Sequence, residues 1–211
     1  MPDMSTEVLL IRHAQTHGNV HDLFCGHTET PLTALGTAQA RALGRRLAAL
    51  GIDAAVSSDL SRASDTARHA LAGRPVELTL DPRLREMHYG DWEARPGKEL
   101  SEKHPEIMRE FFQGKRPVPG GETIEALRGR TSRAIRELAE THRGGTVMVV
   151  SHGNAIQAML AELLGLRTEA TWTFAFDNAS LTRLHFSKSG RLTVRSMNDA
   201  THTEGLDETH G

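Results

Sequence analysis

The chain has 211 residues, which is enough for one sizeable domain with a buried core and few for two. Apolar residues make up 38% and charged residues 25%, a balance typical of globular proteins and not of disordered chains. The formal net charge is −2, whereas nucleic-acid-binding proteins usually carry a basic surplus, so we expect no nucleic-acid partner.

The first residues and the cysteine content indicate the compartment. Residues 1–7 are polar and acidic, and the apolar run after them, residues 8–11, is too short for a signal peptide or a membrane span. We therefore expect a cytoplasmic protein with no membrane partner. The single cysteine, Cys25, cannot form an internal disulfide, which fits a reducing compartment. We interpret it as a structural thiol or as part of a substrate loop.

The first quarter of the chain predicts a strand, a loop and a helix. Residues 8–11 are typical of a short buried strand, and residues 16–31 are polar and contain glycine, as in a loop. Residues 31–51 are rich in Ala and Leu and predict a helix, with Thr33 as its N-cap and Gly51 at its C-terminal end.

The alternation of strands and helices continues to the middle of the chain. Residues 54–58 predict a short strand, residues 59–73 a second helix, and residues 76–80 a strand. Residues 84–121 are less regular. They contain a polar helical segment at 97–114 and then a turn in the sequence PVPGGE.

The second half of the chain has clearer patterns. Residues 123–142 predict a long helix, residues 145–153 a buried strand that ends in a glycine turn, and residues 154–165 another helix. Residues 179–187 and 191–198 predict a β-hairpin.

This order of elements predicts an α/β fold. Strands that alternate with helices favour a three-layer sandwich, in which helices cover both faces of a mostly parallel central sheet. We assign residues 1–198 to a single domain and expect residues 199–211 to form a polar, flexible tail.

Two of the predicted strands end in similar side chains. Arg12 and His13 follow the first strand, and His152 and Gly153 end the segment at 145–153. Ligands of such sheets bind beyond the carboxyl ends of the strands. We therefore expect these side chains to meet at one edge of the sheet.

Together with Arg62 and Glu86, these residues form a coherent set for phosphoryl transfer. A phosphomonoester carries a charge of roughly −1.5 to −2, and a guanidinium has the planar fork that fits phosphate oxygens. Each such pair contributes about 4 kcal/mol of Coulomb attraction at about 4 Å and an effective dielectric constant of about 20. A neutral imidazole can attack phosphorus, and neighbouring cations help to keep an imidazole neutral. A carboxylic acid can protonate the departing alkoxide.

Five sequence blocks resemble those of the histidine phosphatase superfamily, which includes the cofactor-dependent phosphoglycerate mutases. In chain order they read RHAQT, PLTALGTAQA, SSDLSRASDTA, LREMHYGDWE and SHG. Each block alone is weak evidence, but their order and spacing resemble the family over residues 8–184. The resemblance implies His13 as the phosphorylated nucleophile, Glu86 as the proton donor, and no metal or other cofactor. The residues expected to hold the phosphoryl group and the substrate are Arg12, Asn19, Arg62, His152 and Gly153.

Two positions depart from the family pattern. Ala14 stands where the family has Gly after the nucleophile; it would be strained if the position requires a positive φ, and tolerated if the position only has to be small. Ala94 stands where relatives usually carry Gly, and an unusual Arg-Pro pair follows it in a loop that would border the leaving group. We expect the rim of the pocket to come from residues 21–30 and 89–119.

Several candidate residues also have a structural interpretation. Glu86 could form a surface ion pair with Arg83 and Arg85, and Asn19 could be a plain turn former. Trp92 is more typical of packing than of substrate stacking.

Other catalytic chemistries find little support. His13, His17 and His21 have the spacing of one helix face, but they follow a strand and span a glycine, so we expect no metal site. The chain has no Gly-x-Ser-x-Gly elbow of a serine hydrolase, and PVPGGET lacks the Lys-Ser/Thr of a P-loop.

The sequence therefore predicts a phosphomonoesterase of the histidine acid phosphatase type, acting on small phosphorylated metabolites. The nearest alternative is a cofactor-dependent phosphoglycerate mutase, in which a long insertion after the proton-donor block helps to enclose the site. Here the connection from Glu86 to Gly120 is compact, which favours water as the phosphoryl acceptor. A second alternative is a catalytically silent binding protein on the same fold. Oligomeric state is not readable from the sequence, so a homodimer stays open.

Overall fold

The computed structural model describes residues 4–206, in which strands and helices alternate as predicted. The strands are β1 Thr6–Arg12, β2 Ala54–Ser57, β3 Leu78–Leu80, β4 Thr146–Ser151, β5 Leu181–Phe186 and β6 Leu192–Asp199. The α-helices are α1 His17–Val20, α2 Ala34–Arg46, α3 Ser61–Ala70, α4 Gly97–Lys103, α5 Pro105–Phe112, α6 Ile124–Thr141 and α7 Gly153–Leu163. The 3₁₀ helices are η1 Pro82–Leu84, η2 Gly90–Trp92, η3 Thr168–Thr173 and η4 Thr201–Thr203.

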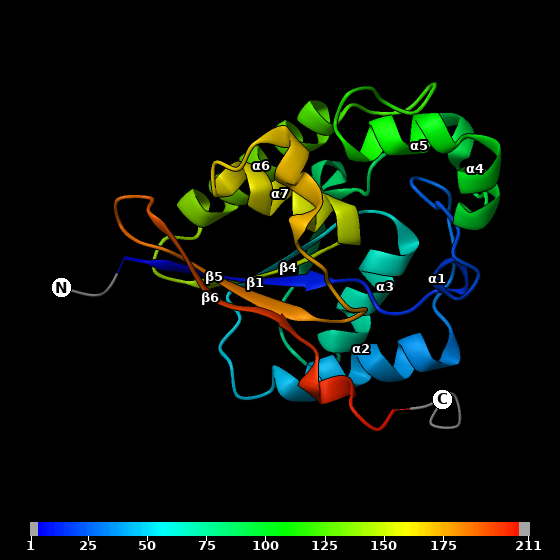
Figure 1. Ribbon diagram of the computed structural model, residues 1–211. Coiled ribbons are helices and arrows are strands. Elements are labelled where there is room, and N and C mark those ends of the chain that lie inside the picture. The colour runs from blue at the N-terminus through cyan, green and yellow to red at the C-terminus, as the bar shows by residue number, and fades with distance from the viewer. Residues whose placement is uncertain (1–3, 207–211) are drawn as a thin grey trace.

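The strands form one six-stranded sheet in the order β3-β2-β4-β1-β5-β6. The pairs β1–β4, β4–β2 and β2–β3 are parallel, and the β5–β6 hairpin adds two antiparallel strands beside β1. The predicted mostly parallel sheet and the C-terminal hairpin are both confirmed. Arg12 of β1 lies opposite Ser151 of β4, so the two strands end at the same edge. In Figure 1, β1 points toward the side of the molecule on which α1 and α4 lie.

Side chains of the central strands alternate between two cores, as the two-residue period of a strand requires. Val8 and Leu10 of β1 pack into a cluster with residues of α6 and α7, whereas Leu9 and Ile11 pack into one with residues of α2 and α3. Helices therefore cover both faces of the sheet, which confirms the predicted three-layer fold (Figure 1). Because β1 and β4 are buried on both faces, they appear in the sequence as unbroken apolar runs.

Helix N-termini follow the local capping signals in the sequence. Thr33 caps α2 as predicted, and its side chain accepts a hydrogen bond from the first turn of the helix. The predicted loop at residues 16–31 contains the short helix α1, where Thr16 and Asn19 form a reciprocal capping box. This single turn was missed because a four-residue helix has too few positions to show a period.

The prediction that Gly51 ends α2 is wrong. The helix ends at Arg46, and its C-cap is Leu47. Arg74 donates hydrogen bonds to the carbonyl oxygens of Leu47 and Leu50, at 3.0 Å for the latter. Since a distant side chain satisfies these carbonyls, the chain leaves the helix before a glycine is needed.

The less regular segment of the chain folds over the edge of the sheet. The predicted helical segment at 97–114 is two helices, and α5 begins at Pro105, which lacks the N–H that a continuous helix would require. Trp92 is 2% exposed and forms an aromatic cluster with Phe24 and Phe111, at ring-centroid distances of 5.6 and 5.8 Å. The packing interpretation of Trp92 is confirmed.

The structure describes part of the predicted C-terminal tail. Arg46 forms an exposed ion pair with Asp199 at 3.2 Å, and η4 follows. Residues 207–211 lie outside the described residues, so the flexible tail and the single-domain assignment stay predictions. In the part of the chain that is described, no helix is both long and apolar enough to cross a membrane.

Candidate active site

A polar cavity of about 260 Å³ lies where β1 and β4 end. Six of the seven residues predicted for the site form part of its wall: Arg12, His13, Asn19, Arg62, Glu86 and Gly153. The seventh, His152, is fully buried and lies behind the wall. The expected meeting of the two strand ends is therefore realised.

His13 is presented to the cavity as a neutral imidazole. Its backbone N–H donates to the carbonyl oxygen of Ser151 at 2.9 Å, which continues the pairing of β1 with β4. Its Nδ1 lies 2.8 Å from the carbonyl oxygen of Ala14. A carbonyl oxygen only accepts, so Nδ1 carries the hydrogen and Nε2 keeps its lone pair. Burial lowers the pKa of His13 well below its usual value, and the charges of Arg62 and Arg12 lower it further.

Ala14 has ordinary backbone geometry. The non-glycine residues with positive φ in the described chain are Asp22, Ala94, Ala179 and Asn198, so the position after His13 does not require glycine. The side chain of Ala14 is fully buried and packs with two other alanines, and its N–H donates to Thr66 Oγ1 at 3.0 Å. The interpretation that this position only has to be small is confirmed.

Two buried guanidiniums line the cavity beside His13. Arg62 is 2% exposed, and its Nη1 and Nη2 groups donate to the carbonyl oxygens of Thr28 at 3.1 Å and Gly26 at 2.6 Å. Arg12 donates through Nη1 to the carbonyl oxygen of Phe176, but its buried Nε has no hydrogen-bond partner. A buried N–H without a partner destabilises a fold by about 1–3 kcal/mol, and more when charged. An anionic ligand in the cavity would satisfy this donor.

His152 follows β4 as His13 follows β1, and the two ring centroids lie 5.1 Å apart. Its Nδ1 accepts a hydrogen bond from Nε of Arg62 at 3.1 Å. The hydrogen is therefore on Nε2, which donates to Ser58 Oγ at 2.8 Å. Burial lowers the pKa of His152 well below its usual value, and Arg62 lowers it further. Contact between His152 and a phosphoryl group stays a prediction.

Glu86 lies in the irregular segment after η1, and the start of α7 holds its carboxylate. The backbone N–H groups of Asn154 and Ala155 donate to its two oxygens at 3.1 and 2.9 Å. A third backbone N–H, that of Met87, donates at 2.8 Å. The N-terminus of a helix has N–H groups without partners in the helix, and those of α7 bind the Glu86 carboxylate. The helix that follows His152 therefore also holds Glu86 in the cavity wall.

The alternative of a surface ion pair for Glu86 is wrong. Arg85 pairs instead with Asp59 at 2.6 Å, and Arg83 pairs with Asp81 at 2.8 Å. Among the described residues, no ion pair includes Glu86 itself, which leaves its carboxylate available to a ligand.

Asn19 stabilises the turn at the start of α1, and its contact with a substrate stays a prediction. Its Oδ1 accepts hydrogen bonds at 3.0 Å from both the backbone N–H and the hydroxyl of Thr16, and at 3.2 Å from Asn178. Because Oδ1 is occupied within the turn, Nδ2 is the group that can donate to a ligand in the cavity.

The rim differs in part from the prediction. Residues 22–26 line the cavity as expected, but of residues 89–119 only Tyr89 does so. Cys25 is among them as a loop thiol, and burial raises its pKa. Four wall residues are not predicted from the sequence: Thr16, Asn154, Gln157 and Phe176. The three-residue spacing of Asn154 and Gln157 at the start of a helix is a signal that could have found them. Phe176, whose backbone carbonyl accepts a hydrogen bond from Arg12, carries no such signal.

The unusual loop after Trp92 reaches the cavity through Phe24. The N–H of Phe24 donates to the carbonyl oxygen of Arg95 at 3.0 Å, and the N–H of Ala94 donates to the carbonyl oxygen of Phe24 at 2.8 Å. Ala94 has a φ of 59°, in the left-handed region that glycine adopts without strain. The alanine at this position is therefore strained, unlike Ala14.

No metal site is evident near the cavity. Within residues 4–206, no group of three or more His, Cys, Asp or Glu side chains is arranged to hold a metal ion. Among these residues, His13, His17 and His21 do not form a metal-binding cluster.

Known proteins are similar to this chain in sequence and in fold. A family model described as histidine phosphatase superfamily (branch 1) matches residues 8–200. The adenosylcobalamin/alpha-ribazole phosphatase of Escherichia coli (strain K12) is 34% identical over 191 residues, which are 90% of this chain and 94% of that one. A Salmonella paratyphi B protein named "Probable phosphoglycerate mutase GpmB" is 32% identical over 210 residues, 96% of this chain and 98% of that one. The solved structure of Bacillus stearothermophilus YhfR has a TM-score of 0.89 and 30% identity, and the match covers 94% of this chain and 100% of that one.

Proposed function

This chain belongs to branch 1 of the histidine phosphatase superfamily, and on that premise we propose that it is a phosphatase that hydrolyses small phosphomonoesters through a phosphohistidine on His13. The observation that supports the proposal is the cavity wall in which His13, Arg12, Arg62 and Glu86 meet. These side chains supply a neutral nucleophile, two fixed cations and a group that can carry a proton.

The first step forms the phosphoenzyme. The lone pair of His13 Nε2 attacks phosphorus, a phosphorus–nitrogen bond forms, and the bond from phosphorus to the ester oxygen breaks. Arg12 and Arg62 bind the non-bridging oxygens and stabilise the charge that spreads over them. Glu86, in its protonated form, gives its proton to the departing oxygen, so that a neutral alcohol leaves. The negative charge of a bound phosphomonoester favours the protonated form of a carboxyl group beside it.

The second step releases phosphate. Glu86, now a carboxylate, removes a proton from a water molecule whose oxygen attacks phosphorus. The phosphorus–nitrogen bond breaks, inorganic phosphate leaves, and Glu86 is protonated for the next cycle. His152 would turn its Nε2–H from Ser58 to a phosphoryl oxygen.

The charge of the cavity favours a phosphatase over a mutase. Apart from Arg12 and Arg62, the wall has no Lys or Arg, and Asp22 adds a negative charge at the rim. A phosphoglycerate carries a carboxylate as well as a phosphate, and this wall does not complement that second charge. The complete set of nucleophile, cations and proton donor also argues against a silent binding protein.

Phosphate release and phosphoglycerate conversion, measured side by side, test the proposal. We expect phosphate release from p-nitrophenyl phosphate and from glycerol 3-phosphate, and an acid-labile phosphoenzyme after rapid quenching. His13→Asn should abolish both signals, whereas His17→Asn, a change at an exposed position of α1, should preserve them. Conversion of 3- to 2-phosphoglycerate faster than phosphate release would establish the mutase instead. Phosphatase activity that persists in His13→Asn would refute the mechanism.

Three finer assignments accompany this proposal. Because the pKa of His13 is lowered, its imidazole stays neutral in mild acid, which supports activity there, as in a histidine acid phosphatase. A cytoplasmic location fits a chain with one cysteine. A homodimer stays open, and sedimentation of the purified protein would decide it.

A further inference from the structure

We propose that Arg130 is a positioning residue for the proton donor Glu86, and that it acts through the backbone rather than through contact with substrate. Arg130 belongs to α6 and does not line the cavity. The inference rests on the proposed function, because it assigns the role of proton donor to Glu86.

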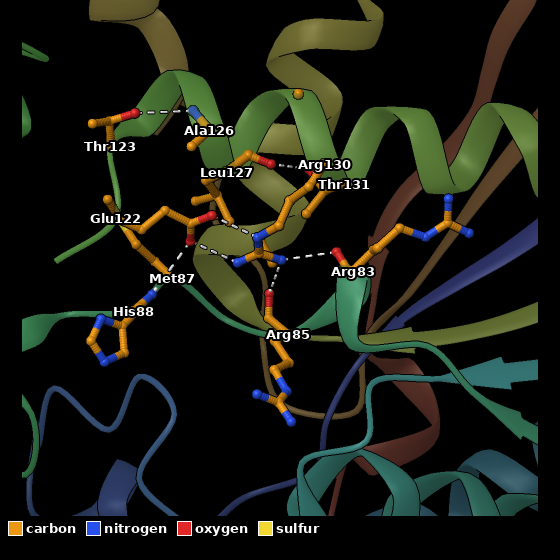
Figure 2. Close-up of polar contacts among 12 residues, drawn as sticks. Arg83, Arg85, Met87, His88, Glu122, Thr123, Ala126, Leu127, Arg130 and Thr131 are labelled. Atoms are coloured by element: carbon orange, nitrogen blue, oxygen red, sulfur yellow. Dashed lines mark hydrogen bonds and ion pairs between the residues drawn. The ribbon is translucent and has the colours of Figure 1, made fainter.

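Arg130 donates hydrogen bonds to three carbonyl groups of the backbone before and at Glu86. Residues 85–89 have no regular secondary structure, so no strand or helix supplies partners for their carbonyl groups. Nη1 of Arg130 donates to the carbonyl oxygens of Arg83 and Arg85 at 2.8 and 2.7 Å. Nη2 donates to the carbonyl oxygen of Glu86 at 2.9 Å. Figure 2 shows Arg130 reaching down from α6 to the backbone at Arg83 and Arg85.

Glu122, from the segment PGGET, fixes the other edge of the same guanidinium. Nε of Arg130 donates to Glu122 Oε1 at 2.7 Å, and Nη2 donates to Oε2 at 2.8 Å (Figure 2). All five N–H groups of the guanidinium therefore donate a hydrogen bond. The two side chains are only 19% and 14% exposed, so solvent screens this ion pair less than a surface pair.

Glu122 also contacts the backbone that follows Glu86. The backbone N–H of Glu122 donates to the carbonyl oxygen of His88 at 2.8 Å. Arg130 and Glu122 thus hold the backbone before, at and after the proton donor. The start of α7 holds its carboxylate, so both ends of this side chain are fixed.

This arrangement predicts a specific kinetic defect. Proton donation requires the donor to lie within hydrogen-bond reach of the ester oxygen, and a displacement of about 1 Å can lower a rate by about 100-fold. Without Arg130, the carbonyl groups of Arg83 and Arg85 lose their donor, and that of Glu86 keeps only His27 Nε2 at 3.0 Å, so the segment that carries Glu86 can shift. In kcat/KM, which the first step determines, the loss should be confined to substrates whose leaving group needs a proton. Nitrophenolate leaves without one, whereas the alkoxide of glycerol does not.

The test compares kcat/KM for glycerol 3-phosphate and p-nitrophenyl phosphate in Arg130→Gln. We expect a decrease of about 10- to 100-fold for glycerol 3-phosphate and of less than about threefold for p-nitrophenyl phosphate. Arg130→Lys, which keeps the charge and some donors, should recover part of the loss. Arg128→Gln is the matched control: Arg128 is also a buried arginine of α6, but it bonds Glu162 and the carbonyl oxygen of Leu166, so it should not change the ratio of the two substrates.

A double variant separates positioning from a general loss of structure. In a Glu86→Gln background, Arg130→Gln should not change the substrate ratio further, because the proton donor is already absent. Equal losses for both substrates, a ratio shift in Arg128→Gln, or a further shift in the double variant would each overturn the inference. If Arg130→Gln does not fold, Glu122→Gln should show a smaller loss of the same selectivity, and no selectivity there would also overturn it. Failure of the proposed function is distinct, since the unmodified chain would then turn over neither substrate.

Discussion

The free energy of unfolding should fall below pH 6.5, because two histidines of the site bind protons less readily in the folded chain than in the unfolded chain. Burial lowers the pKa of both His13 and His152 well below the usual value of 6.5. Below pH 6.5 the unfolded chain therefore binds more protons at these two positions than the folded chain does. Protonation therefore stabilises the unfolded state, and stability is lost as the pH falls through this window.

The size of the effect follows from the number of protons that differ. Each such histidine lowers the free energy of unfolding by about 1.4 kcal/mol per pH unit once the pH lies well below its unfolded-state pKa. Between about pH 7.5 and about pH 5.5, the pair should therefore remove about 3 kcal/mol, a large part of a typical stability of roughly 5–15 kcal/mol.

Urea unfolding at about pH 7.5, 6.5 and 5.5 measures this loss. His13→Gln should lose about 1.4 kcal/mol less than the unmodified chain over this range, because one of the two proton-binding differences is absent. His17→Gln, at an exposed position, should follow the unmodified chain. Parallel losses in the unmodified chain and His13→Gln would refute the reasoning, since His13 would then titrate alike in both states.

Four further measurements test other features of the site. Ala94→Gly should raise the free energy of unfolding in urea by up to about 1 kcal/mol, because relief of a left-handed alanine outweighs the greater freedom of glycine in the unfolded chain; a decrease would contradict the strain. Inorganic phosphate should raise the Tm of the unmodified chain, by the equivalent of about 2.7 kcal/mol at about 100 times its Kd. It should not change the Tm of Arg12→Met, and equal Tm shifts in the two proteins would show that the anion binds elsewhere. Hydrolysis of p-nitrophenyl phosphate should persist below pH 6.5, since His13 stays neutral there, and a rate that declines with an apparent pKa of 6.5 would argue against it. EDTA should leave this hydrolysis unchanged, and inhibition that a divalent metal reverses would restore the metal interpretation.

Most of the fold was predictable because its signals are local. The apolar runs of β1 and β4 and the cap at Thr33 depend on residues within a few positions of one another. The wrong end of α2 shows the limit of such signals. There the side chain of Arg74 donates hydrogen bonds to the carbonyl oxygens of Leu47 and Leu50. Because these carbonyls already have a donor, the helix can end before Gly51.

The candidate site divides in the same way. Its chemistry-bearing residues lie in short blocks at strand ends, so their identity and their common edge could be inferred from the sequence. The rim could not be inferred, because Phe176 meets Arg12 through a backbone carbonyl, a group that every residue carries, and Phe24 is held by a loop about 70 residues away. The hydrogen bonds by which Arg130 holds the backbone at Glu86 could not be predicted from the sequence either, since their acceptors are carbonyl groups that any residue carries.

By itself, the sequence determined the unbroken apolar run that makes β1 a buried strand and the presence of His13 directly after it. It also determined which side chains could carry charge and protons at that place. Only the tertiary structure decided the state of those groups. His13 is neutral because folding buries it beside Arg62 and Arg12, and its hydrogen is on Nδ1 because a carbonyl oxygen lies 2.8 Å away. Protonation and tautomer depend on distance and burial, which exist only once the strands are paired and the helices cover them.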